Sequence, residues 1–240
     1  MRQDVNRTGG KEGWVCVQSG SFLIFTRFEM LEVVDLECMR GDRRLLTGLS
    51  FKLEPGELLH LHGHNGSGKT TLMRTVCGLI QPTEGEIRWD GEDIREQSDE
   101  FNRDLVYIGH KNGIKDDLNG IENLRICSVL DGIRISEQQA WDALEKMGLR
   151  GHEDLPARVL SQGQKRRVAL ARLLTHDAKL WILDEPFTAL DKAAVEFLQS
   201  VIRDHVAGGG MVILTTHQDV SLTQGHARQL QLGWKGEGDV

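Results

Sequence analysis

Residues 63–70 have the residue types and the spacing of a loop that binds phosphate. A glycine and four further residues precede Gly68-Lys69-Thr70. Glycines let the backbone curl so that N–H groups point at phosphate oxygens, the Lys69 ammonium adds a point charge, and the Thr70 hydroxyl can reach Mg²⁺. The pattern therefore predicts a site for a nucleoside triphosphate with Mg²⁺. The predicted loop residues are Gly63, His64, Asn65, Gly66, Ser67, Gly68, Lys69, Thr70 and Thr71.

The segments on either side are those that such a loop requires. Residues 58–62 predict a short strand, and residues 71–77 predict a helix that begins directly after the loop. Asp90-Gly91 is a strong hairpin signal, so antiparallel strands are expected beside the loop strand, which a simple doubly wound α/β sheet would not have. The predicted antiparallel strands lie in residues 31–38, 45–53 and 86–89.

Two later apolar strands each end in polar residues. Residues 180–183 lead to Asp184 and Glu185, and residues 211–216 lead to His217. A carboxylate at a strand end is where a Mg²⁺ partner is expected, and the adjacent Glu185 could orient or deprotonate water. These residues are the candidate catalytic and metal-binding groups.

Helix-period apolar residues predict an inserted helical subdomain at about 113–160. Ile121, Leu124, Ile126, Val129 and Leu130 recur on the first of its helices. After the subdomain, Ser161 is a plausible N-cap, so the helix that it begins can present free N–H groups to an anion.

Composition limits the class of protein. With 240 residues, the chain is expected to form one large domain or a domain with an inserted subdomain. The formal net charge of −7, without a Lys/Arg-rich run, argues against a protein that coats nucleic acid. Residues 21–25, the longest apolar run, are far short of the ~20 residues of a membrane span. The chain is expected to be soluble unless a partner holds it to a membrane.

The four cysteines are scattered, with no C-x-x-C spacing and no nearby His pair. This spacing indicates neither a zinc site nor a haem attachment motif. Reduced thiols in the cytosol fit best. The cysteines are Cys16, Cys38, Cys77 and Cys127.

Both ends of the chain differ from the middle. Residues 1–29 combine a positive start with a short apolar patch, but Gln18-Ser19-Gly20 interrupts the patch and no signal-peptide cleavage site follows. We expect an extension without fixed structure or a start assigned too early, with Met30 the true beginning; an ordered added strand or an amphipathic contact is the alternative. Residues 233–240 are expected to be a tail, preceded by the packed positions Leu222, Leu230 and Leu232.

Over residues 30–232, the order and spacing of four motifs resemble those of ABC-transporter ATPase subunits. The motifs are the loop at 63–70, Leu160-Ser161-Gln162-Gly163-Gln164, residues 180–185 and His217. The resemblance implies a phosphate-loop ABC ATPase fold: a RecA-like α/β core with an antiparallel β-subdomain and an inserted α-helical subdomain. A narrower resemblance is to the CcmA family, the ATP-binding subunits of the cytochrome c biogenesis (haem exporter) system. It rests on residues 107–110, 113–115, 122–124, 181–191 and 212–218.

The resemblance also implies roles for single residues in ATP hydrolysis. Lys69 would bind the β- and γ-phosphates, and Thr70 and Asp184 would hold Mg²⁺. Glu185 would be the catalytic base, and His217 would sense the γ-phosphate. The residues expected at a contact with a second copy are Ser161, Gln162 and Gly163, which would close over that copy's nucleotide, and Asp191.

The implied partners are a second copy in the ATP-bound state, the integral membrane subunit CcmB and other cytochrome c maturation proteins, with no nucleic acid. The implied place is the cytoplasmic face of the bacterial inner membrane, as a peripheral protein. Either haem export or ATP-driven release of a haem-loaded carrier would use such an ATPase.

Two positions depart from most ABC ATPases. His110 stands where Gln is usual, and we interpret it as a modified residue that couples the site to the membrane partner rather than an incidental loop histidine. Arg40 falls where an aromatic ring usually stacks on adenine; a guanidinium can also stack on a base. The preference for adenine therefore stays open.

Several other residues could suggest chemistry but have simpler interpretations. The alternating His60, His62 and His64 invite a metal or haem site, yet incidental packing is favoured, with His60 and His62 on one face of a strand. Tryptophans are expected as core or subdomain anchors, and the arginines after Ser161 as a solvated helix face. These residues are Trp89, Trp141, Trp181, Arg166, Arg167 and Arg172.

Two other functions remain as alternatives. The chain could serve another ABC transporter, which the residues at 181–191 and His110 disfavour. The chain could also be a soluble ABC protein acting on nucleic acid or ribosomes. Such a protein would commonly need two cassettes or a long coiled-coil insertion, and this sequence contains neither. A phosphate-loop GTPase is disfavoured because the Asn-Lys-x-Asp motif that reads guanine is missing.

Overall fold

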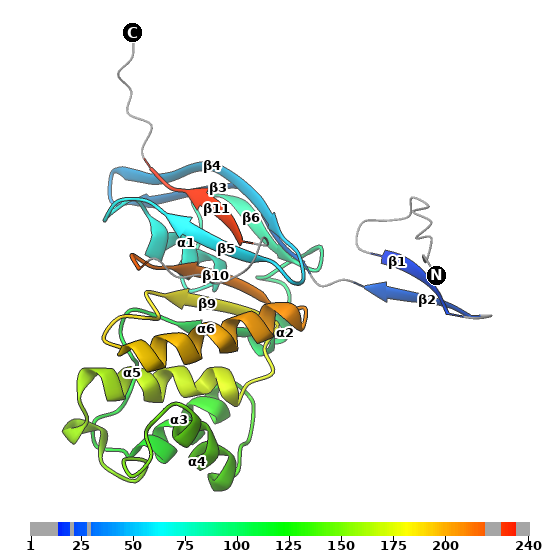
Figure 1. The fold of residues 1–240 in the computed structure, drawn as a ribbon. Helices are drawn as coiled ribbons and strands as arrows, with labels where there is room; N and C mark the ends of the chain where they lie inside the picture. Colours follow the sequence, from blue (N-terminus) through cyan, green and yellow to red (C-terminus); the bar gives the residue numbers. More distant parts are fainter. Residues whose placement is uncertain (1–13, 20–21, 28–29, 219–226, 234–240) are drawn as a thin grey trace.

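A parallel sheet carries the phosphate loop at the end of one of its strands (Figure 1). The computed structural model describes residues 14–19, 22–27, 30–218 and 227–233. Within these ranges the strand order of the parallel sheet is β11-β5-β10-β9-β8. Neighbouring parallel strands therefore bring the ends of β5, β9 and β10 together. The strands are β5 (Leu58–His62), β8 (Leu105–Ile108), β9 (Leu180–Asp184), β10 (Met211–Thr215) and β11 (Ala227–Gln231).

A separate antiparallel sheet with the order β4-β3-β6-β7 lies beside the loop strand, as predicted. The hairpin between β6 and β7 turns through Asp90 and Gly91, with φ of 58° and 82°. Positive φ at both central residues matches the tight hairpin turn that Asp-Gly favours. The α/β class with added antiparallel strands is thus confirmed. The strands are β3 (Leu31–Arg40), β4 (Arg43–Leu53), β6 (Glu84–Trp89) and β7 (Glu92–Asp93).

The two faces of the parallel sheet pack against different elements. Successive side chains of a strand point to opposite faces, and Ile182 and Leu183 accordingly belong to different apolar clusters. Ile182 lies with residues of α1 (Lys69–Val76) and of the antiparallel sheet. Leu183 lies with residues of α5 (Gln162–Leu170) and α6 (Lys192–Ala207). Strands β9 and β10 are buried on both faces, so their ends are rigidly placed.

The predicted helical segment contains α3 (Gly120–Leu130) and α4 (Glu137–Lys146). Leu124 and Leu144 share one apolar cluster with the sheet, so the two helices are packed onto the core. On the outer side of α3, Val129 and Leu130 are 58% and 79% exposed, which helical periodicity alone does not reveal. Shorter helical turns are α2 (Ser98–Arg103), η1 (Ala157–Val159) and η2 (Ala171–Leu174).

Trp89 and Trp181 are buried, as expected for core anchors. Trp141 is instead 38% exposed, so its interpretation as an anchor was wrong. It lies on α4, whose buried residues are Ala140, Ala143 and Leu144. Small residues and one leucine fill that side of the helix and leave the indole at the surface.

Within residues 1–29, two segments form a strand pair. β1 (Trp14–Ser19) pairs antiparallel with β2 (Phe22–Arg27). Both segments are rich in β-branched and aromatic residues, which favour strands. Residues 1–13, 20–21 and 28–29 lie outside the described residues.

Near the carboxyl end, Leu232 is buried and Leu230 packs partly against the core, as predicted. Leu222 and the tail after residue 233 lie outside the described residues. Cys38, Cys77 and Cys127 are free thiols. In the described parts of the chain, no helix is both long and apolar enough to cross a membrane.

His205 on α6 is expected to make stability depend on pH. Its ring stacks on the Trp181 indole with centroids 3.6 Å apart, and burial lowers the pKa of His205 to about 4. A histidine in an unfolded chain has a pKa of ~6.5, so protons favour the unfolded state. The stabilisation is complete above about pH 6.5 and is lost as the pH falls toward 4.

Urea unfolding at pH 7 and pH 5 measures this effect. We expect the free energy of unfolding of the parent to fall about 2 kcal/mol more than that of His205→Phe over this interval. Equal losses in both proteins would contradict the assignment to His205.

Candidate nucleotide site

The phosphate loop joins β5 to α1. The helix begins at Lys69, and its N-cap residue Gly68 has a φ of 100° and makes no side-chain cap bond. The first N–H groups of α1 and the positive end of its dipole are therefore available to an anion. A Cβ on Gly63 would lie 2.3 Å from the Leu232 carbonyl oxygen and 2.5 Å from Ser67 Oγ, so only glycine fits there. Both features suit a backbone that wraps closely around phosphate.

A hollow of about 590 Å³ opens over this loop. Most of the predicted site residues line it, although they come from distant parts of the sequence. Arg40 lines it as well, beside Arg43. Gly63, His64 and Ser67 belong to the loop but not to the lining. The predicted lining residues are Asn65, Gly66, Gly68, Lys69, Thr70, Thr71, His110, Asp184, Glu185 and His217.

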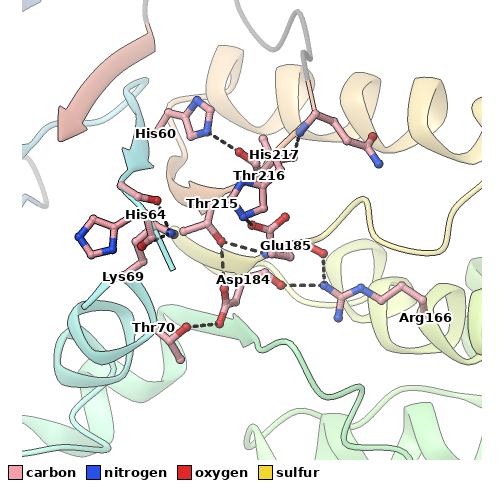
Figure 2. Close-up of polar contacts among 12 residues, drawn as sticks. His60, His64, Lys69, Thr70, Arg166, Asp184, Glu185, Thr215, Thr216 and His217 are labelled. Atoms are coloured by element: carbon pink, nitrogen blue, oxygen red, sulfur yellow. Dashed lines mark hydrogen bonds and ion pairs between the residues drawn. The ribbon is translucent and has the colours of Figure 1, made fainter. Parts of the chain in front are cut away.

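Lys69 Nζ donates to the carbonyl oxygens of Gly63, at 2.6 Å, and His64, at 3.2 Å (Figure 2). The ammonium is thus held over the loop. Ser67 is buried and its Oγ has no hydrogen-bond partner among the described residues. An unpartnered hydroxyl and an ammonium group at one place fit a triphosphate.

The Asp184 carboxylate is fixed by two hydroxyl groups (Figure 2). Thr70 Oγ1 donates to Oδ2 at 3.0 Å, and Thr215 Oγ1 donates to Oδ1 at 2.9 Å. Asp184 is the last residue of β9 and is buried. A hydroxyl and a carboxylate in contact are hard oxygen ligands of the kind that Mg²⁺ prefers, so the residues present fit that ion.

Glu185 follows directly and faces His217. Its Oε1 lies 3.4 Å from His217 Nε2. The Glu185 side chain is mostly buried, whereas the imidazole is 67% exposed. A carboxylate and an imidazole in this arrangement can share a proton or orient a water molecule between them and a phosphate.

Ser161, Gln162, Gly163 and Asp191 do not line the hollow. Ser161 is the predicted N-cap of α5: its Oγ accepts from Gln164 N at 3.2 Å, and Gln164 Oε1 accepts from Ser161 N at 2.8 Å. Ser161 and Gln162 are exposed. A Cβ on Gly163 would lie 2.5 Å from the Ala189 carbonyl oxygen. This helix start is therefore presented to solvent, away from the loop of its own chain.

Asp191 caps α6, accepting from Ala194 N at 2.9 Å, and it also pairs with Arg167 at 2.5 Å. Arg172 pairs with Asp131 at 2.9 Å. Arg166 is only 3% exposed, and burial lowers the pKa of its guanidinium. The interpretation of these arginines as a solvated helix face was therefore wrong: Arg166 packs against the end of β9, and Arg167 and Arg172 each pair with an aspartate.

Thr215 and Arg166 are the site residues that the sequence did not reveal. Thr215 precedes the recognised histidine by two positions, and its contact with Asp184 follows from the parallel pairing of β10 with β9. The sequence did offer one signal: Thr215 is a polar residue at the end of an apolar strand, and another apolar strand ends in the acid Asp184. Arg166 gave no such signal, because helical periodicity does not show which face of a helix contacts the backbone carbonyl groups of another element.

The three alternating histidines divide as expected. The rings of His60 and His62 lie together with centroids 3.8 Å apart, while His64 Nδ1 lies 2.9 Å from its neighbour's carbonyl oxygen. His60 Nε2 lies 3.4 Å from Thr216 O, and burial, followed by the charge of His62, lowers the pKa of His60. Among the described residues, no group of three His, Cys, Asp or Glu side chains could hold a metal ion.

The sequence and the fold both match known proteins. The ABC transporter family pattern matches residues 46–188. The cytochrome c biogenesis ATP-binding export protein CcmA of Dechloromonas aromatica is 55% identical over 85% of this chain and 100% of its own length. That of Nitrosomonas europaea is 57% identical over 81% of this chain and 92% of its own.

Solved structures agree with the sequence relatives. A putative ABC transporter ATP-binding protein from Pyrococcus furiosus has a TM-score of 0.72 at 26% identity, covering 85% of this chain and 97% of its own. The ATP-binding subunit of another ABC transporter has a TM-score of 0.70 at 28% identity, covering 78% and 79%. With the loop, the acids at the end of β9 and the histidine after β10 in one hollow, the chain belongs to the ABC transporter ATPases and, among them, to the CcmA family.

Proposed function

We propose that residues 30–232 form the ATPase domain of a cytochrome c biogenesis transporter, with residues 1–29 and 233–240 outside it. The observation that carries this proposal is the assembly of the Thr70–Asp184 pair and the Glu185–His217 pair over the phosphate loop. The chain would bind ATP and Mg²⁺ and couple hydrolysis to a membrane partner.

Each residue has a distinct part in hydrolysis. Lys69 turns from the Gly63 carbonyl to the β- and γ-phosphate oxygens, and Thr70 and Asp184 supply the oxygen ligands for the metal. Mg²⁺, when bound, neutralises charge that develops on the phosphate oxygens. Glu185 accepts the proton of the attacking water, and His217 contacts the γ-phosphate beside that water.

The segments that lie outside the hollow support a site shared by two copies. Ser161, Gln162 and Gly163 present a helix N-terminus to solvent, where the dipole and the N–H groups favour an anion. A second copy, related by a two-fold axis, would place this helix start over the γ-phosphate held by the first copy, with Asp191 near the contact. The expected assembly is a homodimer in the ATP-bound state.

An exposed apolar surface on the helical segment supports the proposed docking of a membrane partner. It consists of Ile126, Val129 and Leu130 of α3 together with Leu79, which follows α1, and all four are exposed at the surface. Leu130 borders two hollows, of about 600 and about 480 Å³, and Tyr107 lines the second, three residues before His110. Apolar side chains gathered at hollows are typical of protein interfaces.

The family membership indicates which protein would occupy that face. We expect an integral membrane subunit, CcmB, with the chain at the cytoplasmic side of the inner membrane among other cytochrome c maturation proteins. Either haem or a haem-loaded carrier would be moved or released, and His110 would transmit the motion. No nucleic acid is expected in the complex.

Purification of the full chain from detergent-solubilised membranes tests this proposal. With ATP and Mg²⁺, the parent should recover a multi-span membrane protein, and Leu130→Glu should lose it because a charge would be buried at the contact. Met39→Glu, which changes an exposed apolar residue on the antiparallel sheet, is the matched control. Recovery of ribosomes or nucleic acid in place of a membrane protein would overturn the transporter proposal.

A further inference from the structure

Glu185 has a backbone conformation that side chains disfavour. Its φ is 51°, in the left-handed region, although it is not a glycine. Residues other than glycine keep such a conformation only where the surrounding structure holds them in it. The neighbours of Glu185 should therefore include groups that fix both adjoining peptide units.

One of these peptide units is held by Thr215. The Glu185 N–H donates to Thr215 Oγ1 at 3.0 Å, and the same hydroxyl donates its own proton to Asp184 Oδ1 at 2.9 Å. Thr215 is fully buried at the end of β10. Because the hydroxyl donates in one direction and accepts in the other, it fixes the metal-binding carboxylate and the backbone of the next residue together (Figure 2).

The other peptide unit is held by Arg166. Its Nη2 donates to the carbonyl oxygens of Glu185 and Asp184, each at 2.9 Å. Its Nε donates to Pro186 O at 3.3 Å, and its Nη1 donates to Gly109 O at 2.8 Å and to Asn112 Oδ1 at 3.3 Å. The guanidinium has five N–H donors, and these five acceptors match them.

The chemistry of this contact requires arginine. A lysine ammonium has three donors and no planar fork, so it cannot reach all these acceptors at once. Gly109 directly precedes His110, so one guanidinium joins the backbone of the His110 loop to that of Glu185. The positive charge of the guanidinium is also attracted by the negative carboxylates of Asp184 and Glu185.

We propose that Arg166 and Thr215 are positioning residues that together hold Glu185 in its left-handed backbone and aim its carboxylate at the attacking water. Neither touches the reacting atoms. This inference rests on the proposed role of Glu185 as the catalytic base. Loss of either contact lets the backbone relax and moves the carboxylate away from the water, while the phosphate loop is left intact.

Single-turnover hydrolysis and ATP affinity of the full chain test the proposal. Arg166→Lys and Thr215→Val should each slow hydrolysis about tenfold or more, because small displacements of a catalytic group cost up to about a hundredfold. The Kd for ATP should stay within about twofold, because the residues of the loop are unchanged. Thr215→Ser, which keeps the hydroxyl, should restore most of the rate.

Matched controls separate positioning from general packing. Arg172→Lys changes another arginine of the same helical region, and Thr75→Val changes another buried threonine; neither residue contacts Glu185. Both controls should keep the parental rate. The isosteric Thr215→Val keeps the test valid if Arg166→Lys lowers the yield of folded protein.

A double-mutant cycle gives the decisive comparison. If Arg166 acts through the Glu185 carboxylate, adding Arg166→Lys to Glu185→Gln should cause no further loss of rate. Parental rates in Arg166→Lys and Thr215→Val would overturn this inference alone. A parental rate in Glu185→Gln would overturn the role of Glu185 itself and identify the proposed function as the part that failed.

Discussion

Glu185→Gln is expected to bind ATP with parental affinity and to lose almost all turnover. The amide keeps the size of the side chain and its place beside His217, but it cannot accept the proton of the attacking water. Removal of a positioned base lowers rates about 10²- to 10⁴-fold. Phosphate release at saturating ATP and Mg²⁺, with equilibrium binding of a fluorescent ATP analogue, measures both quantities.

The matched control is Glu100→Gln, an exposed residue in the first turn of α2. It should hydrolyse ATP like the parent. A Glu185→Gln protein with the parental rate would show that another group takes the proton. A protein that no longer bound nucleotide would show instead that Glu185 shapes the pocket.

Ser161→Asp is expected to abolish hydrolysis while the fold and ATP binding to the chain's own loop survive. Asp is as good an N-cap as Ser, so α5 should keep its start. The new carboxylate would, however, lie against the γ-phosphate held by a second copy, and the two negative charges would repel each other. The measurement is phosphate release, compared with thermal unfolding and nucleotide binding of the same variant.

Ser136→Asp provides a close control because α4 begins with the same arrangement. Ser136 Oγ accepts from Gln139 N at 3.1 Å, and Gln139 Oε1 accepts from Ser136 N at 2.9 Å. Both serines are exposed N-caps. Ser136→Asp should be neutral. Equal losses in the two variants would mean that the effect comes from the cap and not from an anion at Ser161.

The sequence alone was enough to predict those site residues whose spacing is dictated by the ligand. A loop that wraps phosphate must have glycines, Lys69 and Thr70 at fixed intervals, so its position could be predicted without the fold. Asp184 could be predicted because it directly follows a continuous apolar run, and His217 because it follows such a run after two threonines. The structure brings these residues to one edge of the sheet, where the strand order places β5, β9 and β10 side by side.

The supporting groups could not be predicted in the same way. Thr215 contacts Asp184 only because β10 pairs with β9, and the pairing of strands far apart in sequence leaves no local pattern. Arg166 was misinterpreted because charged residues on a helix normally face water, whereas here backbone carbonyls at a strand end need donors. Val129 and Leu130 follow a helical period, yet the period does not tell a core face from an exposed apolar face.

If two copies complete each nucleotide site, mixing two inactive variants should restore activity. Lys69→Ala removes the loop cation, and Ser161→Asp blocks the helix start, so each homodimer should be inactive. In a mixed dimer one site combines the intact loop of the Ser161→Asp chain with the intact helix start of the Lys69→Ala chain. An equal mixture should therefore regain as much as about a quarter of the parental ATPase activity if the dimer is two-fold symmetric. A mixture as inactive as its two components would contradict a shared site.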